Sequence, residues 1–256
     1  MQRPFSRTQL LLGPEAMDRL GRSRVAVFGV GGVGGYVVEA LARSGIGALE
    51  IIDSDRFSLS NLNRQLYATL ETLGQYKVDA AADRVRTINP DCDVRAHKVF
   101  FLPETAGQFD FAACDYVVDA VDTVKAKLGL VTQAQAAGTP IISAMGAGNK
   151  LDPTALRVAD IYQTSVCPLA RIMRAECRKR GIRALKVVYS TEPPVRPAES
   201  ADAIRRAEAA PGEATVPLRR DIPGSTAFVP SAMGLIIAGQ VVRDLCAGMG
   251  RAQMRS

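Results

Sequence analysis

Short apolar segments alternate with longer amphipathic segments through the first 145 residues of the chain. The short segments have the length and β-branched content of buried strands, and the longer ones have apolar positions at helical spacing. The predicted strands are Arg24–Phe28, Leu49–Asp53, Tyr116–Asp119 and Pro140–Ser143, and the predicted helices are Val33–Ser44, Lys77–Ile88 and Lys125–Ala137. Because parallel strands need long crossover connections, this alternation predicts an α/β fold in which a mostly parallel, twisted sheet carries helices on both faces.

The pattern changes after residue 146, where the regular alternation ends. The segments predicted beyond it are strands at Leu156–Val158 and Lys186–Ser190, a basic helix at Cys167–Arg180 and a small-residue-rich buried helix at Gly224–Leu245. These strands are expected to add mixed or antiparallel pairing to the sheet. Residues 192–222 are rich in Pro, Ala, Glu and Arg with little apolar periodicity, which predicts a mobile surface loop.

The length of 256 residues predicts one domain, with an N-terminal arm (1–22), a core (23–150) and a C-terminal part (151–256). Apolar residues make up 47% and charged residues 23%, which excludes a disordered chain. No apolar segment follows a basic start, and the most apolar late stretch, Ala227–Leu245, is interrupted by polar residues, so neither a secretory signal nor a membrane span is expected. Five scattered cysteines without a CxxC pair favour reduced thiols in a cytoplasm.

A glycine-rich turn follows the first predicted strand and opens the first predicted helix. Gly29, Gly31 and Gly34 fit the spacing GxGxxG, with Gly32 between them, and Asp53 ends the next strand 19 residues beyond Gly34. Glycines let backbone N–H groups approach a phosphate at the positive end of a helix, and a carboxylate placed like Asp53 accepts hydrogen bonds from ribose hydroxyls. The pattern predicts a nucleotide site in a Rossmann-like sheet. A glycine-rich packing turn is the alternative, and the motif alone fits NAD as readily as ATP.

The segment after Asp53 favours ATP because it brings two cations to the same loop. Arg64 and Lys77 suit the β- and γ-phosphates, and Asp122, at the carboxyl end of a later strand, can hold Mg²⁺ together with phosphate oxygens. Each residue also has an ordinary explanation: a surface ion pair for Arg64, a solvated helix terminus for Lys77 and a helix cap for Asp122. Their coincidence beside one glycine loop favours the nucleotide site.

These motifs together resemble a known family. The residues that carry the resemblance are the glycine loop, the stretch containing Asp53, Asp55, Asn61, Asn63, Arg64 and Gln65, the downstream Lys77 and the pair Asp119 and Asp122. They are similar to the ThiF/MoeB/HesA superfamily, relatives of ubiquitin-activating enzymes. Within it, the segments Gly146–Pro153, Thr164–Arg171 and Gly224–Pro230 resemble those of the tRNA threonylcarbamoyladenosine dehydratases.

The resemblance implies an activity and a set of site residues. Members adenylate a carboxylate with ATP; in the dehydratases that carboxylate belongs to threonylcarbamoyladenosine in tRNA, and the neighbouring carbamoyl group then closes a ring. The nucleotide-binding residues implied are Gly29, Gly31, Gly32, Gly34, Asp53, Asp55, Asn61, Asn63, Arg64, Gln65, Lys77 and Asp122. Arg64, Lys77 and Asp122 are implied in catalysis, the last as the Mg²⁺ ligand. The resemblance further implies a homodimer in which Arg7 reaches the partner's site, with residues 151–256 as the substrate and dimer part, and sulfur-acceptor or desulfurase-type partner proteins.

The basic charge is concentrated in the C-terminal part. The formal net charge is +6 with a pI near 9.2, and the stretch from residue 171 to 186 holds seven basic residues against the single acid Glu176. Such a cluster is compatible with a nucleic-acid partner, because phosphate contacts supply affinity and register. The residues expected to contact tRNA are Arg171, Arg174, Arg178, Lys179 and Arg180. A solvated helix face is the alternative explanation.

Two departures from the wider superfamily bear on the function. Members that serve ubiquitin-like carriers have two CxxC zinc pairs, which this chain lacks. Thioester-forming members need an activated cysteine; Cys167 lies near the start of the basic helix, but isolated cysteines are more often core residues. The single histidine, His97, lies in a strand-like stretch, Arg95–Phe101, and is expected to be structural. Three classes therefore stay open: a tRNA dehydratase, an enzyme adenylating the C-terminus of a carrier protein, and an NAD-binding or non-catalytic Rossmann protein.

Overall fold

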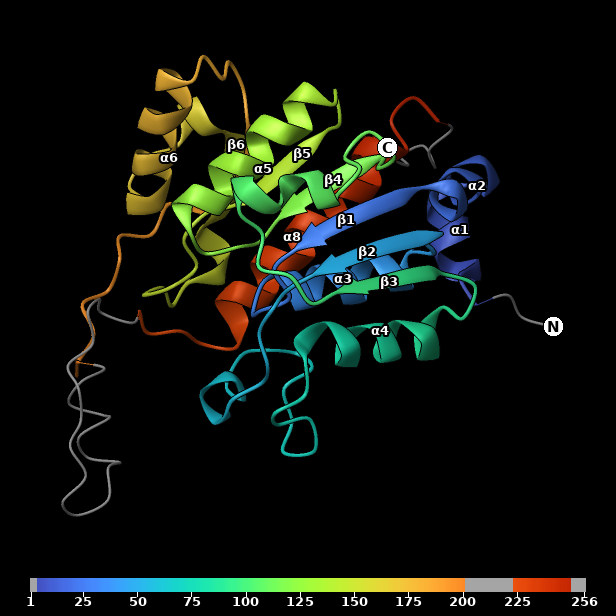
Figure 1. The fold of residues 1–256 in the computed structure, drawn as a ribbon, viewed down its shortest axis with the longest axis horizontal. Helices are drawn as coiled ribbons and strands as arrows, with labels where there is room; N and C mark the ends of the chain where they lie inside the picture. Colours follow the sequence, from blue (N-terminus) through green and yellow to red (C-terminus); the bar gives the residue numbers. More distant parts are fainter. Residues whose placement is uncertain (1–3, 201–222, 250–256) are drawn as a thin grey trace, which may run out of the picture.

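A seven-stranded sheet runs through the part of the chain described by this computed structural model, residues 4–200 and 223–249 (Figure 1). Its strands are β1 (Arg24–Phe28), β2 (Ala48–Ile52), β3 (Asp93–His97), β4 (Tyr116–Asp119), β5 (Ile141–Ala144), β6 (Leu156–Asp160) and β7 (Lys186–Ser190). The spatial order is β3-β2-β1-β4-β5-β7-β6. The pairs are parallel except β6, which runs antiparallel to β7. The predicted mostly parallel sheet with an antiparallel addition near its C-terminal part is confirmed.

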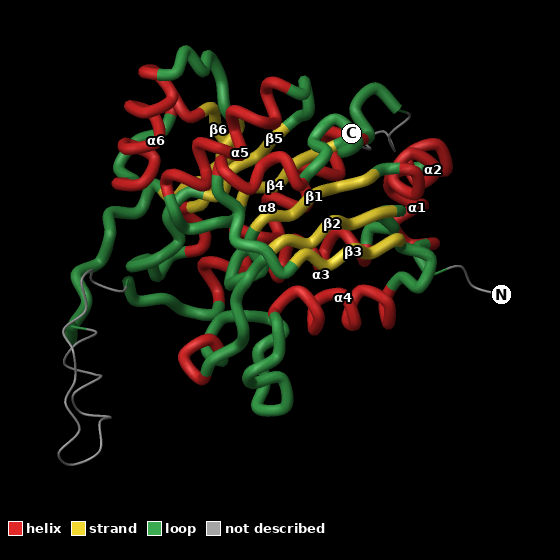
Figure 2. The backbone as a smooth tube through the Cα atoms, in the orientation of Figure 1, coloured by secondary structure: helices red, strands yellow, loops and turns green. Residues whose placement is uncertain are grey.

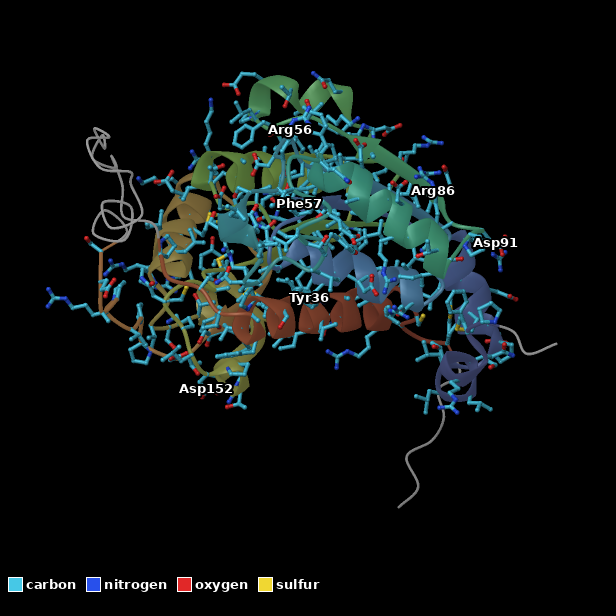
Figure 3. The ribbon with its side chains drawn as sticks, turned by 90° about the horizontal axis from the view of Figure 1, so that it is seen from below. Tyr36, Arg56, Phe57, Arg86, Asp91 and Asp152 are labelled. Atoms are coloured by element: carbon cyan, nitrogen blue, oxygen red, sulfur yellow. The ribbon has the colours of Figure 1, made fainter. Side chains whose placement is uncertain are left out.

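Helices cover both faces of the sheet (Figure 2). They are α1 (Ser6–Leu12), α2 (Pro14–Arg22), α3 (Gly34–Arg43), α4 (Lys77–Ile88), α5 (Val124–Ala136), α6 (Pro168–Lys179) and α8 (Phe228–Leu245). Short 3₁₀ turns lie at Leu59–Asn61 (η1), Pro103–Gln108 (η2), Pro153–Ala155 (η3) and Ile161–Gln163 (η4). The α3, α4 and α8 side chains share one buried cluster, whereas those of α5 and α6 share another. Figure 3 shows α8 as the outer layer on its side of the molecule.

The central strand β1 shows why the sheet needs both layers. Its side chains alternate between the two faces, as the pleat requires. Val25 and Val27 belong to the cluster that includes α3 and α8, whereas Ala26 and Phe28 pack in a separate cluster with Phe101 on the opposite face. A strand buried on both faces has no polar side to present to water, which explains the apolar run Val25–Phe28 that follows Arg24 in β1.

Most predicted bounds lie within two residues of the observed ones, and three segments differ further. The strand expected near His97 is Asp93–His97 and ends where Arg95–Phe101 was expected to continue. The last helix begins at Phe228, so residues 224–227 precede it and form no helix or strand. The N-terminal arm contains two helices, of which α1 buries no side chain. The predicted loop 192–222 lies outside the described residues from position 201 onward, and residues 192–200 form no helix or strand.

Helix α8 is long and apolar enough to cross a membrane by length and composition. Half of that segment is buried inside the structure, where it packs along α3 and against strands β4, β5 and β7. Its apolar character is therefore explained by its place in the layer beneath the sheet.

Candidate nucleotide site

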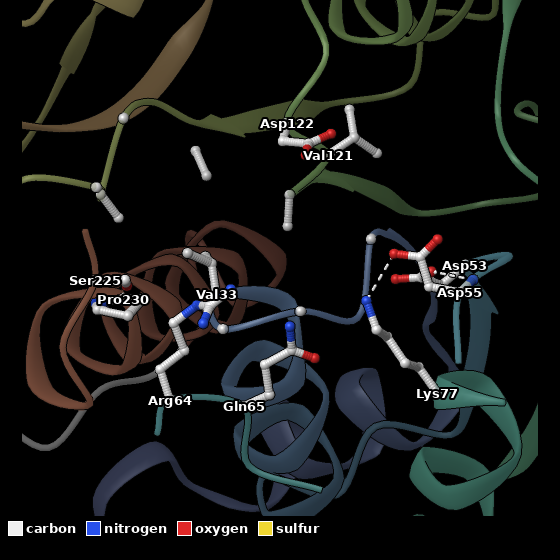
Figure 4. Close-up of a pocket in the computed structure, with 18 of the residues that line it drawn as sticks. Val33, Asp53, Asp55, Arg64, Gln65, Lys77, Val121, Asp122, Ser225 and Pro230 are labelled. Atoms are coloured by element: carbon white, nitrogen blue, oxygen red, sulfur yellow. Dashed lines mark hydrogen bonds and ion pairs between the residues drawn. The ribbon is translucent and has the colours of Figure 1, made fainter. Parts of the chain in front are cut away.

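A cavity of about 460 Å³ opens at the carboxyl ends of the strands (Figure 4). It lies where the strand order reverses between β1 and β4, the position at which open α/β sheets bind their ligands. The sequence-predicted residues that line it are Gly29, Gly31, Gly32, Asp53, Asp55, Arg64, Gln65, Lys77 and Asp122. Residues separated by up to 93 positions along the chain therefore meet at one end of the sheet.

The glycine turn between β1 and α3 requires glycine at two positions. Gly29 has a φ of +89°, and a β-carbon on it would lie 2.6 Å from the carbonyl oxygen of Ala120. A β-carbon on Gly34 would lie 1.8 Å from the carbonyl oxygen of Gly29. Gly34 itself is buried and does not line the cavity, so its part is to let the helix start close under the turn. Gly31 and Gly32 are the members of the motif whose backbone faces the cavity without such crowding.

Asp53 follows β2 and holds the turn from the side. Its carboxylate accepts hydrogen bonds from the backbone N–H of Val30 at 2.7 Å and of Asp55 at 2.9 Å. Burial raises the pKa of the Asp53 carboxyl, and the charge of Lys77 and the two backbone hydrogen bonds oppose that rise. The carboxylate is thus positioned beside the glycine turn, as expected for a ribose-binding group.

The two predicted cations occupy different surroundings. Lys77 begins α4 with a side chain only 7% exposed, and its Nζ lies 2.8 Å from Oδ2 of Asp55. Arg64 donates to the Ser60 carbonyl at 2.8 Å and to Oδ1 of Asn63 at 2.9 Å, and it makes no ion pair within the described residues. Burial lowers the pKa of Arg64. Lys77 is therefore no solvated helix terminus and Arg64 no surface ion pair.

The loop after β4 carries Asp122 at the cavity wall. Asp122 is exposed, and the N-cap of α5 is Thr123, so Asp122 does not cap that helix. The loop rests on a buried network below it. Lys127, 1% exposed, lies 3.1 Å from both carboxylate oxygens of Asp119 and donates to the Ala144 carbonyl at 2.6 Å, and Ser143 Oγ also bonds Asp119. This network ties the carboxyl ends of β4 and β5 together.

Among the described residues, no group of three or more His, Cys, Asp or Glu side chains could hold a metal ion by itself. Mg²⁺ commonly takes one or two carboxylates and completes its shell with phosphate oxygens and water. Asp122 is free of ion pairs within the described chain and lines the cavity, so its donor chemistry fits a phosphate-bound Mg²⁺.

Gln65 is a buried residue of the cavity whose side-chain oxygen lacks a partner within the described part of the chain. Its side chain is buried, and its Oε1 accepts no hydrogen bond from any described residue. A buried acceptor without a donor costs free energy unless a ligand supplies one. Gln65 therefore fits a ligand-binding role better than a packing role.

Asn61 and Asn63 were predicted in the pocket, but neither lines it. Asn61 Oδ1 accepts from the Ser58 N–H at 3.2 Å and so closes the η1 turn. Asn63 Nδ2 donates to the Ser225 carbonyl at 3.0 Å, which links the Arg64 loop to the wall before α8. Their contacts support the residues that do line the cavity.

Arg7 lies far from the cavity of its own chain. It is an exposed residue of α1, which sits with α2 at the end of the sheet where β1 and β2 begin, whereas the cavity lies where these strands end (Figure 1). The structure does not bring Arg7 together with the other predicted site residues within one chain.

Several basic side chains in and directly after helix α6 already have partners within the chain. Arg174 donates to the carbonyl and hydroxyl oxygens of Thr164 at 2.8 and 2.6 Å. Lys179 and Arg180 both pair with Glu176. The guanidinium of Arg178 lies over the Tyr162 ring, 5.4 Å from its centroid. Arg171 is exposed and makes no ion pair within the described residues.

Several lining residues were not predicted. Apolar residues close the side near β3, and small residues and prolines close the opposite end; these are Val99, Phe100, Phe101, Ala144, Met145, Gly146, Ala147, Gly148, Leu169, Pro223, Ser225 and Pro230. The apolar run Val99–Phe101 directly after a strand end is a signal that could have located the first group, because ligands of such sheets lie at strand ends. Most of the second group lies in the segments Gly146–Pro153, Thr164–Arg171 and Gly224–Pro230, which carried only the family resemblance.

Two residues considered as alternatives lie elsewhere. Cys167 is 2% exposed, does not line the cavity and precedes α6 within the α5–α6 core. His97 Nε2 lies 2.6 Å from Oε2 of Glu50. Neither is placed to act on a ligand in this cavity.

A glycine turn beneath a helix start, at the strand reversal of a parallel sheet, places this chain among the α/β proteins that bind nucleotides at the carboxyl edge of the sheet. More narrowly, the chain belongs to the ThiF family, which it matches over residues 5–253.

The chain is similar to characterised members over nearly its whole length. It is 44% identical to the tRNA threonylcarbamoyladenosine dehydratase of Bacillus subtilis, covering 96% of this chain and 95% of that protein. It is 31% identical to the enzyme of the same name from Escherichia coli, with 96% and 95% covered. A crystal structure of the E. coli tRNA N6-threonylcarbamoyladenosine dehydratase, TcdA, in complex with ATP aligns with a TM-score of 0.82 at 29% identity, covering 95% of this chain and 94% of that one.

Proposed function

We propose that this chain is an ATP-dependent dehydratase that adenylates the carboxylate of threonylcarbamoyladenosine in tRNA and cyclises it, with release of AMP and pyrophosphate. The observation that carries the proposal is the cavity, which is lined by a glycine turn, the Asp53 carboxylate and the cations Arg64 and Lys77. The chain also aligns over nearly its whole length with dehydratases of that name. A nicotinamide site has no need of Arg64 and Lys77.

The chemistry follows from the charges around the cavity. The substrate carboxylate attacks the α-phosphorus of ATP, and the charge that develops on the phosphate oxygens is stabilised by Arg64 and Lys77. Lys77 is held at 2.8 Å from Asp55 and so is positioned before the nucleotide arrives. Asp53 orients the ribose, and Gly31 and Gly32 offer backbone N–H groups to the phosphates.

The second step needs no protein nucleophile. The carbamoyl group beside the activated carbonyl attacks it, and AMP leaves, which amounts to the loss of one water from the nucleoside. Such an intramolecular attack is fast once the leaving group is attached, because the reacting atoms are already neighbours. The burial of Cys167 agrees with a route that uses no thioester.

We propose Asp122 as the protein ligand of Mg²⁺, with phosphate oxygens completing its shell. The ion would neutralise phosphate charge and so assist the departure of pyrophosphate. Asp122 supports this role because it is exposed at the cavity wall and engages no cation within the described chain.

The exposed face of α6 is proposed to contact tRNA phosphates. Arg171 and Arg178 are the strongest candidates, because Arg174 is engaged with Thr164, and Lys179 and Arg180 are engaged with Glu176. Phosphate contacts of this kind give affinity and register more than sequence choice.

A homodimer is proposed to complete the site with Arg7. Arg7 lies at the end of the sheet remote from its own cavity, so it can serve only a cavity in a second copy. Exposed apolar side chains on α1 and α8, including Leu10, Leu11 and Leu235, support an interface on these helices. Mixing Arg7→Ala chains with Lys77→Met chains is expected to restore activity, since one site of each mixed dimer is intact; no recovery would exclude the shared site.

The main test uses the purified chain with ATP, Mg²⁺ and tRNA that carries threonylcarbamoyladenosine. The expected products are AMP, pyrophosphate and a nucleoside lighter by one water, measured by mass analysis under mild extraction so that the ring does not reopen. Unmodified tRNA is the control and should give no AMP. Pyrophosphate exchange that depends on a carrier protein and ignores tRNA would instead favour the second candidate, adenylation of a carrier's C-terminus. We place this reaction in the cytoplasm, where the five free cysteines stay reduced.

A further inference from the structure

The end of the cavity remote from Asp53 is formed by two loops without regular structure. One is Gly146–Gly148, directly after β5, and the other is Pro223–Ser225, before α8. Figure 4 shows Ser225 and Pro230 at one end of the cavity and Asp53 and Lys77 at the other. Neither loop has a helix or sheet ladder to fix it, so its position depends on individual contacts.

Asn149 joins these loops through both its backbone and its side chain. Its N–H donates to the Gly224 carbonyl at 2.8 Å, and its Oδ1 accepts from the Gly224 N–H at 2.7 Å. Its carbonyl accepts from the Val195 N–H at 2.8 Å. One residue thereby binds the chain on both sides of the segment between Val195 and Gly224.

The backbone of Asn149 is in the left-handed region, with a φ of 56°. Apart from glycine, asparagine is among the residues that adopt this conformation most readily, because its short polar side chain bonds locally. The asparagine at this position therefore suits the left-handed backbone. Here it aims the side-chain oxygen at Gly224.

Neighbouring contacts hold the same wall from other directions. Gly148 lies so close to Pro223 that a β-carbon on it would be 2.8 Å from the proline Cβ. Asn63 Nδ2 reaches the Ser225 carbonyl at 3.0 Å. The buried Lys150 donates to the Glu192 carbonyl. Asn149 is the member of this group that engages the wall by side chain and backbone together.

We infer that Asn149 is a positioning residue for the substrate end of the cavity: it holds Pro223–Ser225 against Gly146–Gly148 and so shapes the space that receives the carboxylate-bearing nucleoside. The inference rests on the proposed function. Asp53 and Lys77 lie at the opposite end, so a nucleotide whose ribose binds there directs its phosphates toward Arg64, and the wall beside Arg64 faces the molecule being activated. Asn149 itself does not line the cavity and acts through Gly224.

The test compares Asn149→Gly with Asn149→Asp in the full chain. Glycine keeps the positive φ but removes the acceptor, whereas aspartate keeps an acceptor for the Gly224 N–H. For Asn149→Gly we expect the KM for threonylcarbamoyladenosine-bearing tRNA to rise about threefold to tenfold, from the loss of the one side-chain hydrogen bond that holds Gly224. The dissociation constant for ATP should stay within about twofold, and Asn149→Asp should recover most of the tRNA effect.

Hydrogen exchange of the Gly224 amide supplies a readout that needs no activity. It should be faster in Asn149→Gly than in wild type and protected again in Asn149→Asp. An unchanged KM for tRNA in the glycine variant, or an equal loss of ATP affinity, would overturn the inference. If the wild-type chain binds ATP but does not dehydrate tRNA, the proposed function fails, while the exchange data still report whether Asn149 holds the wall.

Discussion

The polar side chains at the amino ends of the sheet differ from those around the cavity at the carboxyl ends, because the fold leaves some of the latter without a partner among the described residues. At the amino ends, Asp244 accepts from the Tyr116 hydroxyl at 2.7 Å, from Lys186 at 2.6 Å and from Gln240 at 2.7 Å. At the carboxyl ends, the Gln65 amide oxygen has no donor within the described chain, and Arg64 has no carboxylate partner there. Asp119 and Lys127, also at the carboxyl ends, are paired, so the difference concerns only the side chains that line the cavity.

The difference separates stability from function. A paired group lowers the free energy of the folded chain, whereas a buried group without its partner raises it until a ligand arrives. The pKa values agree: burial raises that of Asp53 and lowers that of Arg64 at the carboxyl end. At the amino end, burial alone would raise the pKa of Asp244, but hydrogen bonds from Lys186, Tyr116 and Gln240 hold it below its ordinary value.

The largest expected effect comes from removing a cation from the cavity at the carboxyl ends of the strands. Lys77→Met keeps the buried volume of the side chain and removes its charge, so turnover should fall about 100- to 1000-fold, the usual loss for a missing electrostatic stabiliser. Steady-state kinetics of AMP release measure it. Lys98→Met is the matched control: Lys98 pairs with Asp79, does not line the cavity and should change turnover less than about twofold. Equal losses in both variants would contradict the role of Lys77.

The next largest effect is expected for a substitution in the glycine turn, and it concerns the free energy of unfolding. Gly34→Ala places a methyl group against the Gly29 carbonyl and should lower the free energy of unfolding by about 3 kcal/mol. Gly21→Ala, in α2, meets no atom within 4 Å and should raise stability by up to about 1 kcal/mol through helix propensity. Denaturant titration of both variants checks the pair. A stable Gly34→Ala chain that still binds ATP would show that the turn has more room than its backbone indicates.

The hydrogen bonds of Asp244 at the amino ends of the sheet should make the free energy of unfolding depend on pH, with a smaller effect than the two changes above. Because the folded-state pKa of Asp244 is depressed, its contribution to stability is complete above its unfolded pKa near 3.8 and is lost as the pH falls through the lower folded value. Asp244→Ala should therefore cost about 1–2 kcal/mol at pH 7, and wild type and variant should converge in acid. Glu176→Ala, which breaks exposed ion pairs on α6, is the control and should leave thermal stability unchanged. A cost that persists in acid would assign the loss to packing.

The smallest expected effect concerns the surface. Arg171→Glu should weaken tRNA binding about threefold to tenfold and flatten its dependence on salt, because one phosphate contact is lost. Arg86→Glu, on α4, changes the net charge equally and serves as the control. Identical salt titrations for the two variants would show that only total charge matters.

Much of the fold follows from local pattern. The sequence-based bounds of β1, α4, β4 and β7 match the structure residue for residue, since each is a buried or amphipathic segment with a clear period. The bounds of edge strand β3 were predicted wrongly because its side chains are mostly exposed and show no apolar alternation. Helix α1 could not be located because it buries nothing and lacks a capping side chain.

The residues that line the cavity likewise fall into those that the sequence could place and those that it could not. Gly29, Asp53 and Lys77 could be placed because their spacing belongs to one strand–turn–helix unit and the next. Pro223, Ser225 and Gly148 could not, because no short-range pattern states that a loop 75 residues away will close on the end of β5. The tertiary contacts between Asn149 and Gly224 and between Gly148 and Pro223 show that they form one wall.

The buried trio of Asp119, Lys127 and Ser143 restricts how this chain can change over time. Replacing Lys127 alone would leave an unpaired carboxylate in the interior, and replacing Asp119 alone would leave an unpaired ammonium group. Either single replacement therefore costs far more folding free energy than a joint replacement by apolar residues. Related chains should therefore alter these three positions together or leave them alone.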